Sequence, residues 1–411
     1  MLLVLCLALG LRAALQMAQP AELLHDRDLY LGIAQGIVAG RGYCTPGTER
    51  PTAFRPPLYP LCLAAAGSIF PWTVAVGIVN GLGTVALILG AWRTAQNLGL
   101  GSVAWLAAGL AAVDPLLVQC AGQPMTETLF TGLVALWLAS ATSMEVSLRG
   151  DLRTGLLFGL VVLCRPTLWP LAGLALLVLL LRRFSGRSSG MRWPWGIGLA
   201  ALLVVAPWVT RNQLVFGTPI LTTTHGGYTL LLANNPVFTR DVVRQSRHIA
   251  WPGESLAAWQ RQLAVDLEQT LGPDAGEVAQ DRQQSRWAWG YIGSQPQEFL
   301  AATAYRLRSL WRLAPQGNEA QGRRVWLLRA AAGFYAIVFG LALLGVVHVL
   351  RFPGRSRWLP CLLLVITVQT VHLFYWTDAR MRAPLVPVIA LLAAVPFTPR
   401  AFPSVPRDTG D

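Results

Sequence analysis

The feature that most constrains the fold of this chain is a series of long apolar runs that recurs along its whole length. A transmembrane α-helix needs roughly 20 mainly apolar residues, and many of the runs approach that length. The candidate spans are residues 2–19, 71–93, 103–119, 125–144, 154–164, 167–182, 194–211, 326–350, 358–376 and 383–398. Because a water-soluble core cannot bury so much apolar sequence, the expected fold is an all-α, polytopic transmembrane helical bundle.

Composition supports lipid as the solvent. Hydrophobic residues make up 54% of the chain and charged residues 13%, whereas soluble domains carry about 25% charged residues. The net charge of +13 raises the question of nucleic-acid binding. The basic residues separate the hydrophobic spans and do not line one face of a polar domain, so we expect membrane lipids as partners and no nucleic acid.

The placement of arginine predicts an orientation in the membrane. Short cytoplasmic loops carry an excess of basic residues. One set of alternate loops and the tail holds Arg93, Arg149, Arg153, Arg182, Arg183, Arg187, Arg192, Arg351, Arg355, Arg357, Arg400 and Arg407. This pattern predicts a multi-pass protein of the inner (plasma) membrane whose N-terminus is cytoplasmic. The first run lacks a positively charged leader, so we expect an uncleaved helix there.

Three regions follow from this topology: residues 1–211, which form an N-terminal transmembrane region with the first outer loop at 20–70; residues 212–325, an extracytoplasmic loop region; and residues 326–411, a C-terminal transmembrane region with a short cytoplasmic tail. The stretches Ser255–Thr270 and Gln280–Gly290 are polar and amphipathic. We therefore expect interfacial helices in the outer loops. The apolar stretch Leu58–Phe70 is too short to cross a bilayer.

Three acids lie on the predicted outer face. Asp26 and Asp28 stand two residues apart in HDRDLY, and Glu127 stands in QPMTETLF at the start of an apolar span. Carboxylates in this arrangement can transfer a proton or bind a metal ion. The alternative is structural: the aspartates belong to a hydrated loop and pair with Arg27 or cap a helix, and Glu127 favours a helix N-terminus.

Five arginines lie on the same face. Arg55 precedes Pro56-Pro57, Arg165 interrupts an apolar run, Arg211 ends a span, and Arg380 and Arg382 stand at a helix entrance. A charge within the bilayer costs roughly 2.5–3.5 kcal/mol on insertion scales, so such residues need a partner. Guanidinium groups bind phosphates well. They can also anchor a helix at the level of the lipid headgroups, and both readings remain open.

The segment that follows Arg211 is rich in polar groups. It contains His225, Tyr228 and Asn234 within a run of Thr, Gly and Asn residues. Hydroxyl, amide and backbone donors of this kind suit a sugar or a phosphate, and we include Tyr228 and Asn234 among the candidate donor-binding residues. An ordinary capped loop is the alternative.

Taken in order, these motifs resemble the bacterial glycosyltransferase family 39-like membrane proteins. That family belongs to the GT-C superfamily, with protein O-mannosyltransferases and lipid A aminoarabinose transferases. The resemblance runs from Asp26 to about Pro387. Its most specific segments are DLYLGIAQGIVAGRGY with RPPLYP, PMTETLF, GLVVLCRPT and PWVTRNQLVFGTPILTTTHGGYTLLLANNP.

The resemblance implies a polyprenyl-phosphate-linked sugar donor and a reaction on the extracytoplasmic side. It implies that Asp26 is the catalytic base or metal partner, with Asp28 as the fallback because Arg27 separates the two acids. Glu127 matches a second acid. The matching residues for the lipid phosphate are Arg165, Arg380 and Arg382. A divalent metal ion, held by Asp26 and Glu127, is left open.

We therefore expect a glycosyltransferase that moves a sugar from a polyprenyl phosphate to an unidentified acceptor in a single inverting step. Two other classes of function remain open. A transporter or flippase for lipid-linked sugars would place essential charges near the midplane of the bilayer, often within inverted repeats, and the sequence shows no such repeat. A non-catalytic protein that binds polyprenyl phosphate would bind donor without turnover.

Overall fold

The computed structural model describes residues 1–145, 147–185, 194–245, 251–314, 324–351 and 353–399. Within these ranges the chain forms helices and one isolated antiparallel bridge, between Cys44 and Pro51, and no strand. The predicted all-α fold class is confirmed. Of the arginines used for orientation, Arg187, Arg192, Arg400 and Arg407 lie outside the described residues.

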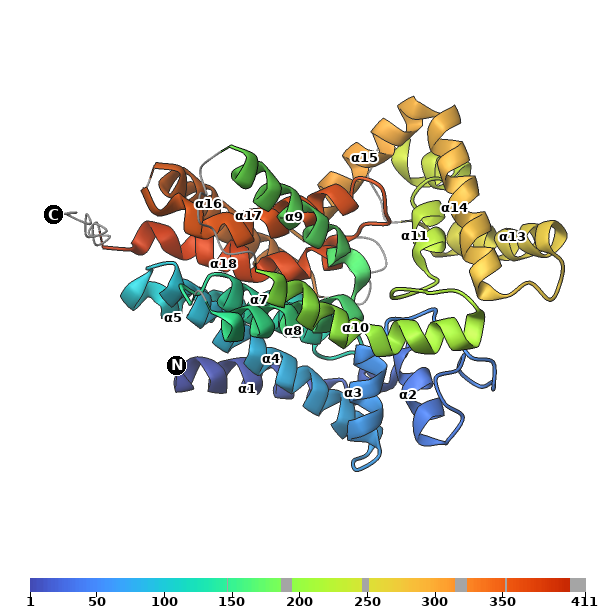
Figure 1. Cartoon of the computed structure of the whole chain (residues 1–411), viewed down its shortest axis with the longest axis horizontal. Coiled ribbons are helices and arrows are strands. Elements are labelled where there is room, and N and C mark those ends of the chain that lie inside the picture. Colours follow the sequence, from blue (N-terminus) through green and yellow to red (C-terminus); the bar gives the residue numbers. More distant parts are fainter. Residues whose placement is uncertain (146, 186–193, 246–250, 315–323, 352, 400–411) are drawn as a thin grey trace.

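A bundle of apolar helices forms the body of the molecule (Figure 1). It contains α1 (Leu2–Ala18), α4 (Trp72–Asn97), α5 (Ala104–Ala112), α6 (Pro115–Cys120), α7 (Glu127–Ala141), α8 (Leu148–Cys164), α9 (Trp169–Phe184), α10 (Trp195–Phe216), α16 (Val325–Arg351), α17 (Leu359–Val371) and α18 (Val386–Ala394). Among the described residues, five segments are long and apolar enough to cross a bilayer: 72–97, 166–184, 195–216, 325–351 and 379–397.

Two of the predicted spans needed correction. The run at 154–164 is part of a longer helix, α8, because Ser147 accepts a hydrogen bond from Gly150 N–H and starts the helix six residues earlier. The charged residues in its first turns hid that start from a hydropathy argument. The run at 103–119 is two helices, since the Asp114 carboxylate accepts from Leu117 N–H and begins α6.

Close helix contacts depend on glycine. A Cβ at Gly132 of α7 would stand 2.3 Å from the carbonyl oxygen of Gly83 in α4, and a Cβ at Gly155 of α8 would stand 2.2 Å from the carbonyl oxygen of Ile197 in α10. Small residues let helices of a membrane bundle approach backbone to backbone. These contacts explain why α4 packs along α7 and α8 along α10.

The described residues of 20–70 and 212–325 form further helices at one end of the bundle. They are α2 (Tyr30–Val38), α3 (Leu58–Gly67), α11 (Gly226–Leu232), α12 (Pro236–Phe238), α13 (Gly253–Leu271), α14 (Glu277–Ser294) and α15 (Pro296–Leu310). Figure 1 shows this group at the end opposite the start of α1. Both predicted amphipathic stretches lie within helices, α13 and α14. The described residues of 20–70 and 212–325 therefore meet at the same end.

Candidate functional site

Two arginines share one aspartate at this end of the bundle. Arg55 Nη2 lies 3.1 Å from Asp28 Oδ1, and Arg380 Nη1 lies 3.8 Å from Asp28 Oδ2. Arg380 also binds Asp378, with Nη2 3.2 Å from Asp378 Oδ2. Asp378 caps the backbone N–H of Arg380 as well. The network joins residue 28 to the turn before α18, although the two lie far apart in the sequence.

A third arginine lies beside this network. Arg165 follows the last residue of α8, and its Nη1 lies 3.2 Å from Glu127 Oε1 at the start of α7. The Glu127 side chain is 2% exposed. The charges of Arg55, Asp28, Arg165 and Glu127 all act on the Tyr30 hydroxyl, and the Arg55 guanidinium lies 5.3 Å from the centre of the Tyr30 ring. Burial raises the pKa of Tyr30 to about 12, which keeps the hydroxyl protonated.

Several strong hydrogen-bonding atoms in the cluster have weak partners or none among the described residues. Arg165 Nη2 contacts the sulfur of Met381 at 3.2 Å, and Arg380 Nη1 contacts the sulfur of Met125 at 3.6 Å. A thioether is a weak acceptor. Arg55 Nε and Glu127 Oε2 are buried without a hydrogen-bond partner. These guanidinium groups therefore have N–H donors without a strong acceptor among the described residues.

Asp26 precedes Asp28 by two residues and is bound through one oxygen only. Its Oδ2 accepts from Gly32 N–H at 2.7 Å, at the start of α2, while Oδ1 is buried without a partner among the described residues. Burial raises the pKa of the Asp26 carboxyl above its ordinary value, although backbone N–H groups of α2 oppose the shift. The carboxylate therefore has a free oxygen and an increased affinity for a proton.

The turn between the two aspartates and α2 is strained. Leu29 has φ +66°, and it is the one non-glycine residue with positive φ among those described. A branched residue in this region costs about 1–3 kcal/mol, and such residues concentrate at functional sites. The turn lets Asp26 cap α2 while Asp28 reaches Arg55.

The segment that carries Arg55 is fastened to the 212–325 region. Glu277 at the start of α14 accepts from Thr52 Oγ1 at 2.7 Å and from Ala53 N–H at 2.6 Å. The Thr223 hydroxyl donates to the carbonyl of Phe54. Glu277 is thus a positioning residue for the arginine that holds Asp28.

Replacing Glu277 by Gln is expected to loosen this segment. Hydrogen bonds to a charged group contribute about 1.5–3 kcal/mol each, so amide hydrogen exchange across residues 50–56 should become faster by about tenfold or more. The exposed Glu268 on α13 offers a matched control, and Glu268→Gln should leave the exchange unchanged. Unchanged exchange in the Glu277 variant contradicts the positioning role.

Two other candidate arginines are placed elsewhere. Arg382 is buried and donates to the carbonyls of Leu310 and Arg312, while its guanidinium lies 4.3 Å from the centre of the Tyr335 ring. Arg211 donates to the carbonyls of Tyr43 and Thr52. Both guanidinium groups therefore fasten loops, and Arg382 does not join Arg380 in a clamp.

Tyr228 and Asn234 are also held by the protein itself. The Tyr228 hydroxyl accepts from Gln260 at 2.7 Å, and its ring stacks on His225. Asn234 donates to the carbonyl of Phe374 at 2.7 Å and accepts from Arg306. Neither lies in the arginine cluster.

The residues do not gather into a metal site. No group of three or more His, Cys, Asp or Glu residues that could hold a metal ion occurs in the described part of the chain. Glu127 pairs with Arg165, and Asp26 caps α2. We therefore route no step of the chemistry through a metal ion.

Three residues of the site were missed in the sequence analysis. Met125 lies two residues before Glu127, Met381 lies between two candidate arginines, and Tyr30 follows HDRDL directly. The one sequence signal for these three residues was that each lies close in sequence to a charged candidate residue. An apolar side chain beside a charge in sequence does not say which way it points, so that signal was not sufficient.

No protein-family model matches the chain, and no curated protein matches it. Among solved structures, it is similar to the Archaeoglobus fulgidus oligosaccharyltransferase tethered with an acceptor peptide containing the NVT sequon, with 15% identity over 96% of this chain and 49% of that chain and a TM-score of 0.55. The structure of AglB from the same organism in complex with an inhibitory peptide and a dolichol-phosphate gives 15% identity, the same coverage and a TM-score of 0.51.

ArnT from Cupriavidus metallidurans bound to undecaprenyl phosphate is also matched, with 15% identity over 90% of this chain and 72% of that chain and a TM-score of 0.36. The present chain spans about half the length of the oligosaccharyltransferase chains. At this identity the likeness concerns the fold. The chain therefore shares the helical fold of the two oligosaccharyltransferase structures over 96% of its own length.

Proposed function

We propose that this protein transfers a sugar from a polyprenyl-phosphate donor to an acceptor at the end of the bundle where the outer loops meet. One observation carries the proposal: three arginines converge there, and two of them direct N–H groups at methionine sulfurs. A phosphate oxygen is a far better acceptor than a thioether. The like-folded AglB structure with a dolichol-phosphate is in keeping with a lipid-phosphate ligand.

The chemistry assigns one role to each kind of group. The acceptor's hydroxyl or amine attacks the anomeric carbon, and its proton passes to the free Oδ1 of Asp26. The bond from the anomeric carbon to the phosphate oxygen breaks, and polyprenyl phosphate leaves with the electron pair. Arg165 and Arg380 bind the phosphate as its negative charge grows, which stabilises the transition state. The displacement is single-step and inverts the anomeric centre.

The structure supports Asp26 over Asp28 as the base. Both oxygens of Asp28 face guanidinium groups, at 3.1 Å from Arg55 and 3.8 Å from Arg380. Asp28 instead orients two arginines, whereas Oδ1 of Asp26 has no hydrogen-bond partner among the described residues.

We place this end of the bundle on the extracytoplasmic side of the plasma membrane. At the other end of the bundle, Arg149 and Arg153 lie in the first turns of α8, and Arg182 and Arg183 lie in the last turn of α9. Basic residues favour the cytoplasmic side. A membrane location suits the donor, since its tail is apolar and its phosphate alone must reach the site.

Transfer assays with reconstituted protein test the function. Proteoliposomes would receive a panel of radiolabelled polyprenyl-phosphate sugars together with membranes of the source cells as acceptors. We expect label to move from the donor lipid to a new product at least about 100-fold faster than without protein. Movement of the donor between leaflets without any product would instead establish a flippase. Donor binding with neither movement nor product would establish a binding protein.

A further inference from the structure

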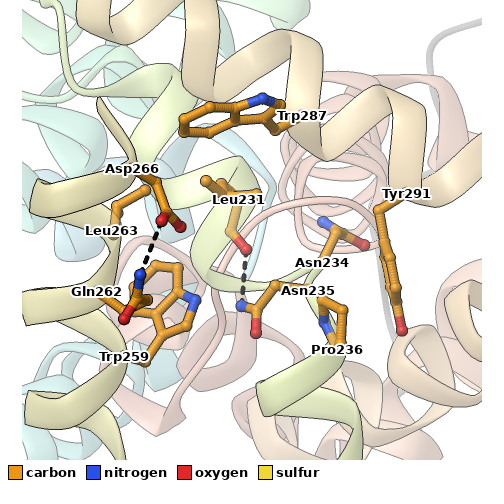
Figure 2. Close-up of a pocket in the computed structure, with 10 residues that line it drawn as sticks. All are labelled: Leu231, Asn234, Asn235, Pro236, Trp259, Gln262, Leu263, Asp266, Trp287 and Tyr291. Atoms are coloured by element: carbon orange, nitrogen blue, oxygen red, sulfur yellow. Dashed lines mark hydrogen bonds between the residues drawn. The ribbon is translucent and has the colours of Figure 1, made fainter. Parts of the chain in front are cut away.

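The 212–325 region contains a pocket of about 330 Å³ that the proposed chemistry does not use. It lies between α11 and α12 on one side and α13 and α14 on the other (Figure 2). Two leucines, Leu231 and Leu263, form part of its wall. The volume falls within the range of small-molecule sites.

Aromatic rings form much of the pocket surface. Figure 2 shows Trp259, Trp287 and Tyr291 around its sides. All three side chains are half-buried, so part of each is available to a ligand. A flat apolar ring face can pack against the C–H face of a pyranose and remove apolar surface from water.

Polar groups of the same pocket point to a ligand rich in hydroxyl groups. Asp266 Oδ1 accepts a hydrogen bond from Gln262 Nε2 at 2.8 Å. Figure 2 shows this bond as a dashed line between the two side chains. Among the described residues, Asp266 Oδ2 receives no hydrogen bond. A free carboxylate oxygen, an amide oxygen and indole N–H groups together provide acceptors and donors for sugar hydroxyls.

The pocket and the arginine cluster differ in the sign of their charge. Among the described residues, no Arg, Lys or His lines the pocket, and Asp266 is its one acidic residue. A phosphate would be repelled here, whereas a neutral sugar would not. The lipid phosphate and the occupant of this pocket are therefore different chemical groups.

Hydrogen bonds join the pocket wall to residues 374–378, the segment that leads to the arginine cluster. Asn234, which lines the pocket, donates to the carbonyl of Phe374, and Trp376 N–H donates to the carbonyl of Thr229 in α11. The same segment continues to Asp378, which holds Arg380. Three residues thus lie between Phe374, which Asn234 contacts, and Asp378 of the ion pair.

We infer that this pocket binds a neutral saccharide unit of the acceptor. Binding of the saccharide stands on the pocket alone, and its description as part of the acceptor rests on the proposed function. The three aromatic rings pack against the C–H face of the sugar, and Asp266 and Gln262 bind its hydroxyl groups.

Direct binding measurements on the full chain in nanodiscs, without donor, test the inference. The probes are glucose, mannose, galactose, N-acetylglucosamine and maltose, measured by saturation-transfer NMR and calorimetry. At least one should bind, and Trp287→Ala and Asp266→Asn should each weaken binding by about tenfold or more. The matched controls are Trp289→Ala, an exposed tryptophan on the same helix, and Asp274→Asn, an exposed aspartate. Both should bind as the parent does.

Two results would overturn the inference. The first is that no saccharide of the panel binds, or that binding is unaffected by both pocket variants. The second is that a short neutral peptide binds when no saccharide does, and that Trp287→Ala and Asp266→Asn weaken the binding of this peptide. Because no donor is present, the outcome does not depend on transfer, and a protein that binds sugar but transfers none would refute the proposed function alone.

Discussion

Replacing Asp26 by Asn is expected to slow sugar transfer by roughly 10²–10⁴-fold, the range that a general base supplies. The asparagine oxygen can still accept from Gly32 N–H and cap α2, so folding and donor binding should persist. The variant removes only the basic oxygen that has no partner among the described residues. Initial rates in proteoliposomes and donor binding by the same preparation measure the two effects.

The matched comparison is Asp28→Asn. This change removes a carboxylate that holds Arg55 and approaches Arg380, so it should raise the KM for donor more than it lowers kcat. The opposite pattern, with turnover lost in the Asp28 variant and retained in the Asp26 variant, would assign the base to Asp28.

The pH dependence of this group has opposite signs for activity and stability. Because burial raises the pKa of Asp26, kcat should fall as pH falls through that raised pKa, where the base becomes protonated. Folded protein holds this proton more tightly than unfolded protein does, so the group's contribution to the free energy of unfolding decreases as pH rises from the ordinary pKa to the raised one. Asp26→Asn should remove both effects and keep the melting temperature at neutral pH equal or higher.

Much of the fold could be predicted because the solvent imposes it. Backbone polar groups in lipid must be satisfied within helices, so apolar runs of the right length predict helices. The predicted helix boundaries were wrong where a side-chain cap sets the start of a helix, as at Ser147 and Asp114. A hydropathy argument counts apolar residues and cannot see one serine or aspartate that satisfies a helix N-terminus.

The charged residues of the site could be listed from sequence, but their partners could not. Arg380 and Arg382 stand two residues apart, yet one binds Asp378 and the other donates to the carbonyls of Leu310 and Arg312. The short 3-10 turn that contains both (Ala379–Leu385) points them differently. Such a difference comes from tertiary packing, because the two residues have the same chemistry and nearly the same sequence surroundings.

The pair formed by Arg165 and Glu127 allows stability and function to be separated. Replacing Arg165 by Gln leaves the buried Glu127 carboxylate without its cation, and removal of one partner from a buried pair costs about 3–5 kcal/mol. The single variant should therefore melt at a lower temperature and bind the lipid-phosphate donor weakly. Transfer by the remaining folded protein should also fall.

The double variant Arg165→Gln with Glu127→Gln distinguishes the two causes. Two neutral amides of similar size can bond to each other, so most of the lost stability should return. Donor binding and transfer should not return, because the guanidinium of Arg165 no longer faces the phosphate, and we expect turnover to stay about 100-fold or more below that of the parent. Thermal melting and transfer rates on the same samples measure the separation.

The control for this cycle is the exposed pair of Arg153 and Glu145, whose side chains are 45% and 39% exposed and whose charged atoms lie 3.2 Å apart. An exposed pair contributes about 0–1 kcal/mol, so Arg153→Gln should change neither melting nor transfer appreciably. If the double variant regains full transfer together with its stability, Arg165 only neutralises a buried acid. The phosphate would then have to be held by Arg55 and Arg380 alone, and the site would lose the arginine that contacts α7.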